Sequence, residues 1–355
     1  MVVSIKVQKL PSLVASNLGK DSYLIVLAYL VVNILLILLA FYILKKTKNK
    51  SLNQTKSVVA KFFVKIFMIF VVVYFLSQSL LLYETIQNLF AHVLFYNLPW
   101  TLFSLMLTVT VFYLAQTGIT NIARNFELYF VIIIASYLII SIFGGMHTDF
   151  TVIFPFETIN IKNVLSSMFK FNLWFGDFFF VLFLGKKSQN IKLKWTLLTY
   201  FLAMIFVTIL YVEFVGIYQA YAPLKPSLIS VISEQSMLGI NIGRVDWFLI
   251  LATEIGTILS CSVCLYYAKV CFGVIFEKVN KNYLLLFLSA VLYLTDVLYL
   301  VDTHSKEMLF LNFITHLSLA VKVLFLVVLL FYCFSLSKKS ERKLLKRMED
   351  GSWKN

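Results

Sequence analysis

Residues 97–146 read NLPWTLFSLMLTVTVFYLAQTGITNIARNFELYFVIIIASYLIISIFGGM, and this stretch decides the fold class. It holds two apolar runs, 97–117 and 127–146, separated by a short polar turn, 118–126, that carries Arg124. A helix needs about 20 predominantly apolar residues to cross the hydrocarbon core of a bilayer. Both runs have that length, so the stretch predicts two membrane-spanning helices joined by a tight connection.

Similar apolar runs fill the rest of the 355-residue chain. Hydrophobic residues make up 61% of it and charged residues only 14%, whereas soluble domains are near half apolar and a quarter charged. A water-soluble fold of this length could not bury so much apolar surface. We therefore predict an all-α polytopic membrane protein with about nine transmembrane helices, near 22–44, 62–83, 97–117, 127–146, 163–185, 194–216, 246–273, 283–301 and 308–335.

The net charge of +14 is explained by topology rather than by nucleic-acid binding, because the basic residues cluster between the apolar runs. The connecting segments 45–57 and 186–194 are rich in Lys, and so is the C-terminal tail. Cytoplasmic loops of membrane proteins are enriched in Lys and Arg, which places the C-terminus in the cytoplasm and residue 1 outside. We expect one transmembrane domain, 1–336, and a basic cytoplasmic tail, 337–355, that binds anionic lipid or simply anchors the topology. Residues 1–21, with Lys6, Lys9 and Lys20, are too short and too charged to form a span.

Short motifs occur along the chain in a fixed order. The most specific begins with Leu98-Pro99-Trp100 and ends, after an apolar span, with Gly118-Ile119-Thr120-Asn121-Ile122-Ala123-Arg124-Asn125-Phe126-Glu127. The others are Leu10-Pro11-Ser12, Gly19-Lys20-Asp21, Phe154-Pro155, Gly176-Asp177 and Arg244-Val245-Asp246. In this order they resemble the B subunit of bacterial spore germinant receptors. These are spore germination permeases of the amino acid–polyamine–organocation transporter superfamily.

The resemblance implies an amino-acid-permease-like fold made of two inverted repeats of five helices. In such folds the first helix of each repeat is discontinuous, and the substrate lies against the free backbone groups at the break. The sixth helix of the family corresponds to residues 163–185. The family has ten spans, and most of the first is missing here, which indicates a misplaced start or a truncated family member.

The resemblance also implies a function. The chain would be the subunit of a germinant receptor that senses a small molecule such as an amino acid. It would work with A and C subunits, surrounded by membrane lipid, in the spore inner membrane. The alternative is a proton-coupled amino-acid permease of the same fold. No motif of an enzyme, a metal site or a phosphate-binding loop stands out, so we expect no catalysis and no cofactor.

The candidate ligand site centres on the sixth family helix. Gly and Asn are poor residues for a helix interior, so a break near Phe171–Gly176 is expected, although Gly176 could instead permit close helix packing. Glu254 could accept a hydrogen bond from a ligand ammonium, or from a neighbouring helix. The ligand-binding residues predicted in this way are Ser166, Ser167, Asn172, Gly176, Asp177, Thr253, Glu254 and Thr257.

Ionisable residues within apolar spans are costly and are often functional. The chain has several: Lys170, Asp177, Glu213, Glu254, Lys269, Asp296, His316 and Lys322. At a rise of about 1.5 Å per residue, Asp177 and Lys322 lie at similar depths, as do Asp296 and His316. Each pair could form a contact between helices. For Asp296 and His316 we expect a purely structural role, and for Asp177 and Lys322 structural and functional roles remain open.

Overall fold

The structure is a computed structural model that describes residues 2–7, 10–46, 58–90, 99–152, 160–183, 192–225, 245–300, 316 and 319–324. Every regular element within these ranges is helical. The α-helices of the described residues include α1 Val2–Lys6, α2 Leu10–Leu18, α3 Tyr23–Lys46, α4 Val58–Leu89, α5 Trp100–Thr117, α6 Ile119–Met146, α7 Ile161–Lys170, α8 Phe178–Phe183, α9 Leu193–Tyr218, α11 Val245–Ile275 and α12 Lys281–Leu300. The 3₁₀ helices are η1 Gly19–Ser22, η4 Phe150–Val152, η5 Asn172–Phe175 and η7 Gln219–Leu224.

Seven helical stretches of the described residues are long and apolar enough to cross a membrane. They are Leu10–Tyr42, Val64–Gln87, Trp100–Thr117, Ile119–Met146, Leu193–Leu224, Leu251–Ile275 and Lys281–Leu298. The all-α polytopic fold predicted from composition is therefore confirmed. Of the nine predicted spans, 163–185 is interrupted, and 308–335 lies mostly outside the described residues. The predicted tail, 337–355, also lies outside them.

The turn between α5 and α6 depends on one glycine. Gly118 has φ +90°, in the left-handed region that residues with a Cβ rarely adopt. It ends α5 and at the same time begins α6, because its carbonyl oxygen accepts hydrogen bonds from the Asn121 and Ile122 amides. The motif that begins at Gly118 therefore has a structural reason: it reverses the chain between two spans without a loop.

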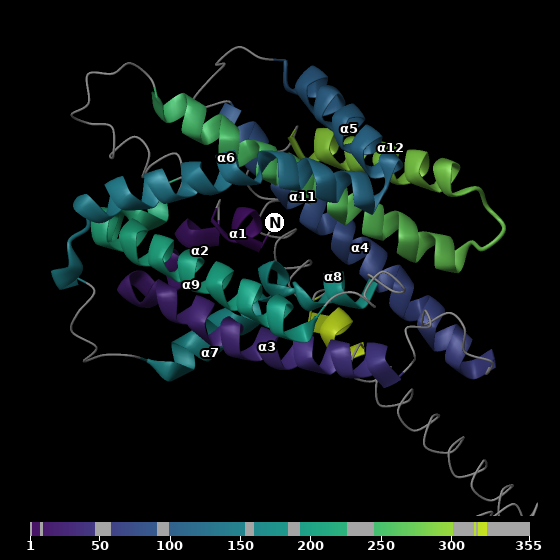
Figure 1. Cartoon of the computed structure of the whole chain (residues 1–355), viewed down its shortest axis with the longest axis horizontal. Helices are drawn as coiled ribbons and strands as arrows, with labels where there is room; N and C mark the ends of the chain where they lie inside the picture. Colours follow the sequence, from purple (N-terminus) through teal and green to yellow (C-terminus); the bar gives the residue numbers. More distant parts are fainter. Residues whose placement is uncertain are drawn as a thin grey trace, which may run out of the picture.

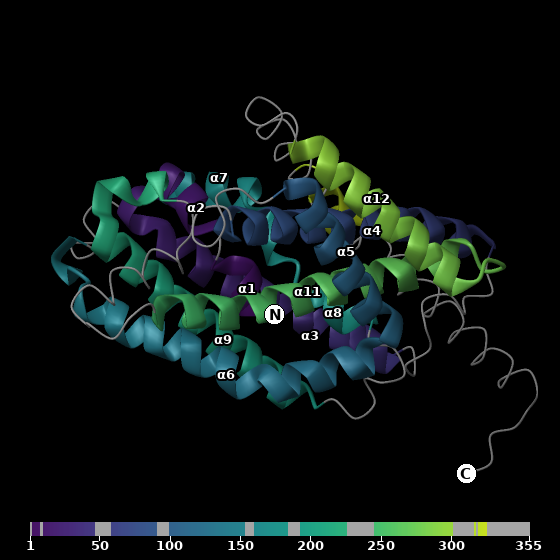
Figure 2. The same ribbon diagram turned by 90° about the horizontal axis from the view of Figure 1, so that it is seen from above.

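The helices pack side by side in a bundle whose interior holds the N-terminal residues (Figure 1, Figure 2). Helix α3 packs against α9, and α4 packs against α11. Helix α1 lies inside the bundle and contacts both α9 and α11, whereas α2 lies nearer the edge beside α7.

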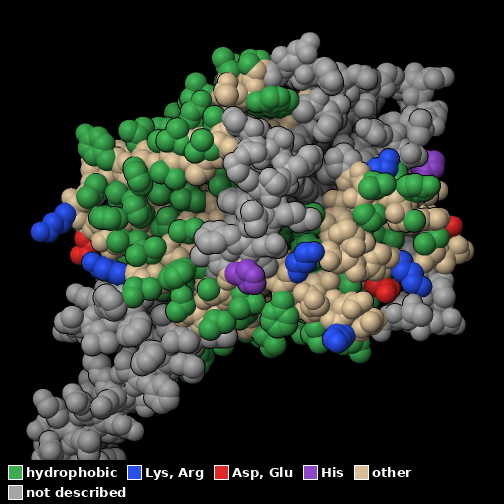
Figure 3. Space-filling view, turned by 180° about the vertical axis from the view of Figure 1, so that it is seen from behind, with side chains coloured by type: hydrophobic (Ala, Val, Ile, Leu, Met, Phe, Trp, Pro, Cys, Tyr) green, Lys and Arg blue, Asp and Glu red, His purple; other side chains and the backbone are tan. Residues whose placement is uncertain are grey.

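The outer surface has the character of a lipid-facing one. Helix α6 exposes large apolar side chains on several successive turns, among them Leu128, Val131 and Ile142. One face of the molecule carries a broad area of hydrophobic side chains, with charged side chains at its margin and on the opposite half (Figure 3). Apolar side chains on the outside and polar groups paired inside are expected where the solvent is lipid.

Candidate functional site

The predicted break in the sixth family helix is present. Helix α7 ends at Lys170, η5 covers Asn172–Phe175, and α8 begins at Phe178. At the other end of α7, the Asn160 side chain accepts hydrogen bonds from the Lys162 and Asn163 amides and so caps the helix. The segment between Lys170 and Phe178 is therefore not α-helical, and its backbone groups need partners other than those of a continuous helix.

A second interruption faces the first. The N-terminal residues form two short helices, α1 and α2, and α1 ends at Lys6. The Lys6 side chain has 0% exposure, and its Nζ lies 2.9 Å from Asp177 Oδ1 and 2.8 Å from Asp177 Oδ2. Asp177, at the end of the break, is itself only 6% exposed. A buried ion pair thus joins the end of α1 to the break between α7 and α8.

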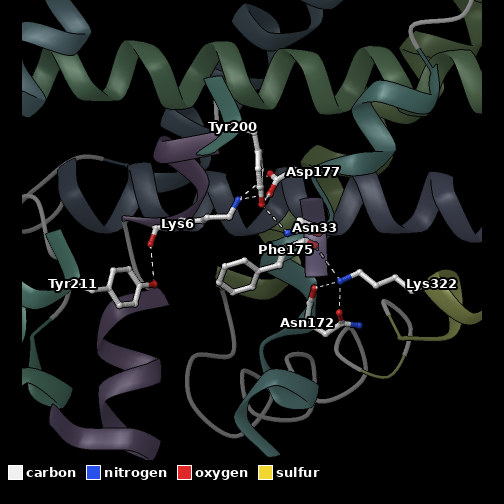
Figure 4. Close-up of polar contacts among 8 residues, drawn as sticks. All are labelled: Lys6, Asn33, Asn172, Phe175, Asp177, Tyr200, Tyr211 and Lys322. Atoms are coloured by element: carbon white, nitrogen blue, oxygen red, sulfur yellow. Dashed lines mark hydrogen bonds and ion pairs between the residues drawn. The ribbon is translucent and has the colours of Figure 1, made fainter. Parts of the chain in front are cut away.

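Two neighbouring helices position this ion pair (Figure 4). From α9, the Tyr200 hydroxyl donates a hydrogen bond to Asp177 Oδ2 at 3.1 Å, and the Tyr211 hydroxyl donates one to the Lys6 carbonyl at 3.0 Å. From α3, the Asn33 amide donates to the Tyr200 hydroxyl at 2.8 Å. A buried charge is stabilised by hydrogen bonds beyond those of its ion pair, and the Tyr200 hydroxyl supplies one to Asp177. Asn33 in turn orients Tyr200, and Tyr211 holds the backbone of Lys6.

The other side of the break is held by Lys322. Its ammonium donates to the Asn172 carbonyl at 3.0 Å and to the Phe175 carbonyl at 3.1 Å, and it also contacts Asn172 Oδ1. Tyr29 of α3 stacks on Phe175 with ring centroids 3.9 Å apart, and its hydroxyl donates to the Met168 carbonyl. Ammonium and hydroxyl groups from other helices therefore donate hydrogen bonds to backbone carbonyls at and beside the break.

Gly176 lies at the point where the break meets α4. A Cβ atom built on it would be 1.9 Å from the Tyr74 hydroxyl oxygen and 2.6 Å from Tyr74 Cζ. The sequence suggests two explanations for Gly176, a helix break and close helix packing, and both are present in the structure. Any larger residue would have to displace either the Tyr74 ring or the break itself.

An apolar cavity of about 970 Å³ reaches the ion pair. It lies mainly between α6 and α9, and Val3 and Ser4 of α1 and Gly256 of α11 also border it. Asp177 and Tyr200 are among its few polar lining residues. The volume is at the upper end of the range of small-molecule sites.

The structure divides the predicted site residues into two groups. Asn172, Gly176 and Asp177 are buried together at the break. Ser167 is buried on the last turn of α7, where its carbonyl accepts the Phe171 amide, whereas Ser166 is exposed. Thr253, Glu254 and Thr257 are buried on α11.

Helix α1 links these two groups. Lys6 contacts Asp177 at the break, and Ser4 lies so close to α11 that a Cβ built on Gly256 would be 3.1 Å from its Oγ. Thr253 and Thr257 lie three residues before and one after Gly256 on α11, and α11 contacts α1. Helix α1 therefore lies between the two groups of residues that are predicted to bind the ligand.

Both charge pairs predicted from depth are wrong. Asp177 pairs with Lys6, and Lys322 bonds instead to Asn172 and Phe175. Asp296 accepts hydrogen bonds from Gln87 at 2.7 Å and Ser104 at 2.6 Å, while His316 is exposed. Depth fixes the position of a residue along a helix but not the direction in which its side chain points, so equal depth does not imply contact.

The remaining ionisable candidates have other surroundings than the ion pair, although Lys170, the last residue of α7, borders the break. Glu213 of α9 is buried and accepts a hydrogen bond from Ser141 of α6 at 2.6 Å. Lys170 is exposed and donates to Asn17 at 3.0 Å, and Lys269 is buried on α11. The contacts of Glu213 and Lys170 tie helices together, and nothing in the surroundings of the three residues gives a reason to add them to the site.

Sequence reasoning missed three central residues: Lys6, Tyr200 and Asn33. The charge of Lys6 predicts that residues 1–21 do not form a span, yet the Lys6 side chain is fully buried. Asn33 offered a signal, because it is a polar amide in the apolar helix α3. Tyr200 offered none, since Tyr is common in such helices and its partner is 23 residues away.

These features define a polytopic α-helical membrane protein in which a buried ion pair joins two interrupted helical segments. The sequence model of the family described as spore germination protein matches residues 1–305, and the chain belongs to this family. No curated protein and no solved structure matches the chain.

Proposed function

We propose that the protein is the subunit of a spore germinant receptor that senses a small amino-acid-like molecule. The observation that carries this proposal is the ion pair between Lys6 and Asp177, which holds the two interruptions together. An amino acid carries both a carboxylate and an ammonium group. The carboxylate of the ligand would bind Lys6 in place of Asp177, and its ammonium group would bind Asp177 in place of Lys6. Neither buried charge would then be left unpaired.

Other groups at the break would orient such a ligand. The Tyr200 hydroxyl is bonded to Asp177 itself, and Asn172 lies at the same break, where its side chain is bonded to Lys322. Ser167 lies one turn before the break, and Thr253, Glu254 and Thr257 would join the site through movement of α1. The apolar cavity beside Asp177 would accommodate the side chain of the ligand.

Sensing requires that binding changes the shape of the protein. A ligand can shift a conformational equilibrium only through contacts that differ between the two states. Exchange of the ion pair for two contacts with the ligand would release α1 from the break between α7 and α8, and this supplies the difference. We infer that the change is read by A and C subunits of the receptor in the spore inner membrane, with the C-terminus of this chain in the cytoplasm.

A proton-coupled amino-acid permease is the second candidate. It is supported by the buried carboxylate of Asp177, which lies at a helix interruption and also lines a cavity. Uptake of labelled amino acids into proteoliposomes that contain the purified chain alone would favour this function. Co-purification with A and C subunits, without uptake, would favour the receptor.

The test is germination of spores whose only copy of this gene carries Asp177→Asn or Lys6→Met. The matched control is Asp296→Asn, because Asp296 is also a buried carboxylate but belongs to a different cluster, with Gln87 and Ser104. With equal protein levels by immunoblot, we expect loss of the response to amino acids in the first two variants and a normal response in the control. A normal response in both Asp177→Asn and Lys6→Met would refute the proposal.

A further inference from the structure

The surroundings of the Lys322 ammonium have the composition of a cation site. An ammonium group has three N–H donors and no acceptor. Here its acceptors are three oxygens from one short segment: the Asn172 carbonyl at 3.0 Å, the Phe175 carbonyl at 3.1 Å and Asn172 Oδ1. The Tyr29 ring lies over the same nitrogen, 5.4 Å from it, within the range of a cation–π contact.

These oxygens converge because of the break. In a continuous helix the Asn172 and Phe175 carbonyls would point along the axis toward the next turn, but η5 ends at Phe175 and α8 begins only at Phe178. Groups of carbonyl oxygens that are free to turn toward one point bind monovalent cations in membrane proteins. The polar groups that bind Lys322 are thus neutral dipoles, whereas the Asp177 carboxylate forms its ion pair with Lys6.

The two buried ammonium groups are kept apart by a pair of aromatic rings. Lys6 Nζ lies 5.4 Å from the centroid of Phe175, Tyr29 stacks on Phe175, and Lys322 lies over Tyr29. The faces of aromatic rings carry negative potential, so this stack reduces the repulsion between the two cations. Each ammonium therefore has its own hydrogen-bond acceptors, while the charges of Asp177 and Lys6 still act on Lys322 across the ring stack.

We propose that the Asn172 and Phe175 oxygens form a monovalent-cation site whose permanent occupant is the ammonium of Lys322. A tethered cation needs no ion from solution, so the fold and its ligand response do not depend on Na⁺ or K⁺. Removal of the amine opens the site to a small free cation. This inference goes beyond the proposed function and holds whichever ligand the protein binds.

The experiment is a chemical rescue of the purified full-length chain. The atoms that Lys322→Ala removes correspond to propylammonium. Apparent melting temperatures in detergent are compared in the chlorides of choline, sodium, ammonium and propylammonium at equal ionic strength. We expect wild type to melt at one temperature in all four salts. Lys322→Ala should melt lower in choline and regain at least about half of the loss in ammonium or propylammonium, with saturation, as binding to the native state requires.

Two controls make the rescue specific. Lys269→Ala removes another buried lysine, on α11, and should gain nothing from ammonium or propylammonium. Lys322→Met fills the space with an uncharged side chain and should not be rescued either. If Lys322→Ala cannot be purified in choline, its recovery is compared between choline and propylammonium throughout purification.

Three results would overturn the inference. They are equal melting of Lys322→Ala in all four salts, equal rescue of Lys269→Ala, and a wild type that is stabilised by Na⁺ relative to choline. Failure to recover Lys322→Ala in any of the salts would also count against it. None of these readouts uses germination or ligand, so the proposed function can fail while the cation site stands, and the reverse.

Discussion

Removal of one partner from the Lys6–Asp177 pair should destabilise the protein more than removal of both. Lys6 is 0% exposed and Asp177 6% exposed, so a charge left alone there has no access to solvent. Breaking a buried pair by removing one member costs about 3–5 kcal/mol, whereas replacing both by neutral groups of similar size is often close to neutral. The single variants Lys6→Met and Asp177→Asn and the double variant form a cycle that separates these cases.

The magnitude can be worked from the contacts that remain. In Lys6→Met, Asp177 keeps the Tyr200 hydroxyl as a donor, which makes this the milder single variant. In Asp177→Asn, the ammonium of Lys6 faces one amide oxygen in place of two carboxylate oxygens. At about 2 °C per kcal/mol for a chain of this size, each single variant should melt roughly 6–10 °C below wild type.

The double variant should melt within about 3 °C of wild type, because no unpaired charge is left inside it. Apparent melting in detergent, followed by the loss of the monodisperse peak in size-exclusion chromatography, measures all four proteins under one condition. The reasoning fails if the two single losses simply add in the double variant, because additivity means that the two side chains do not interact in the folded protein.

Three further predictions concern other parts of the molecule. Gly176→Ala should cost about 1–3 kcal/mol by overpacking against Tyr74, and Tyr74→Phe should restore only part, since Cζ would still be 2.6 Å from the new Cβ; an unchanged melting temperature in Gly176→Ala would contradict this. Gln87→Leu should cost about 1–3 kcal/mol because Asp296 loses a donor, while the response to amino acids persists; loss of that response at normal protein level would be the contrary result. A single cysteine at position 187, in a variant without the native cysteines, should react with an impermeant reagent only after the membrane is opened, and labelling of intact cells would disprove the predicted topology.

The fold class could be predicted because it depends on properties of short segments. Spans follow from the length and apolarity of each run. Asn172 and Gly176 make a break near Phe171–Gly176 reasonable, and the family resemblance decides in its favour over close packing at Gly176. The ion pair could not be predicted, since Lys6 and Asp177 are 171 residues apart and the direction of each side chain depends on how the helices pack. The burial of Lys6 could not be predicted either. A Lys in a short N-terminal segment is normally exposed to solvent, and Lys6 is buried only because Asp177 pairs with it.

The central claim is that an amino-acid-like ligand binds by exchanging the Lys6–Asp177 ion pair. It is tested most directly by equilibrium binding of labelled amino acids, each in turn, to purified wild type, Asp177→Asn and Asp296→Asn, with all three shown to be folded by their melting curves. The account predicts saturable binding of at least one amino acid by wild type and Asp296→Asn, and at least about tenfold weaker binding by Asp177→Asn, since a lost charge-assisted contact of about 1.5–3 kcal/mol corresponds to that factor or more. Equal affinity in wild type and Asp177→Asn would contradict the account.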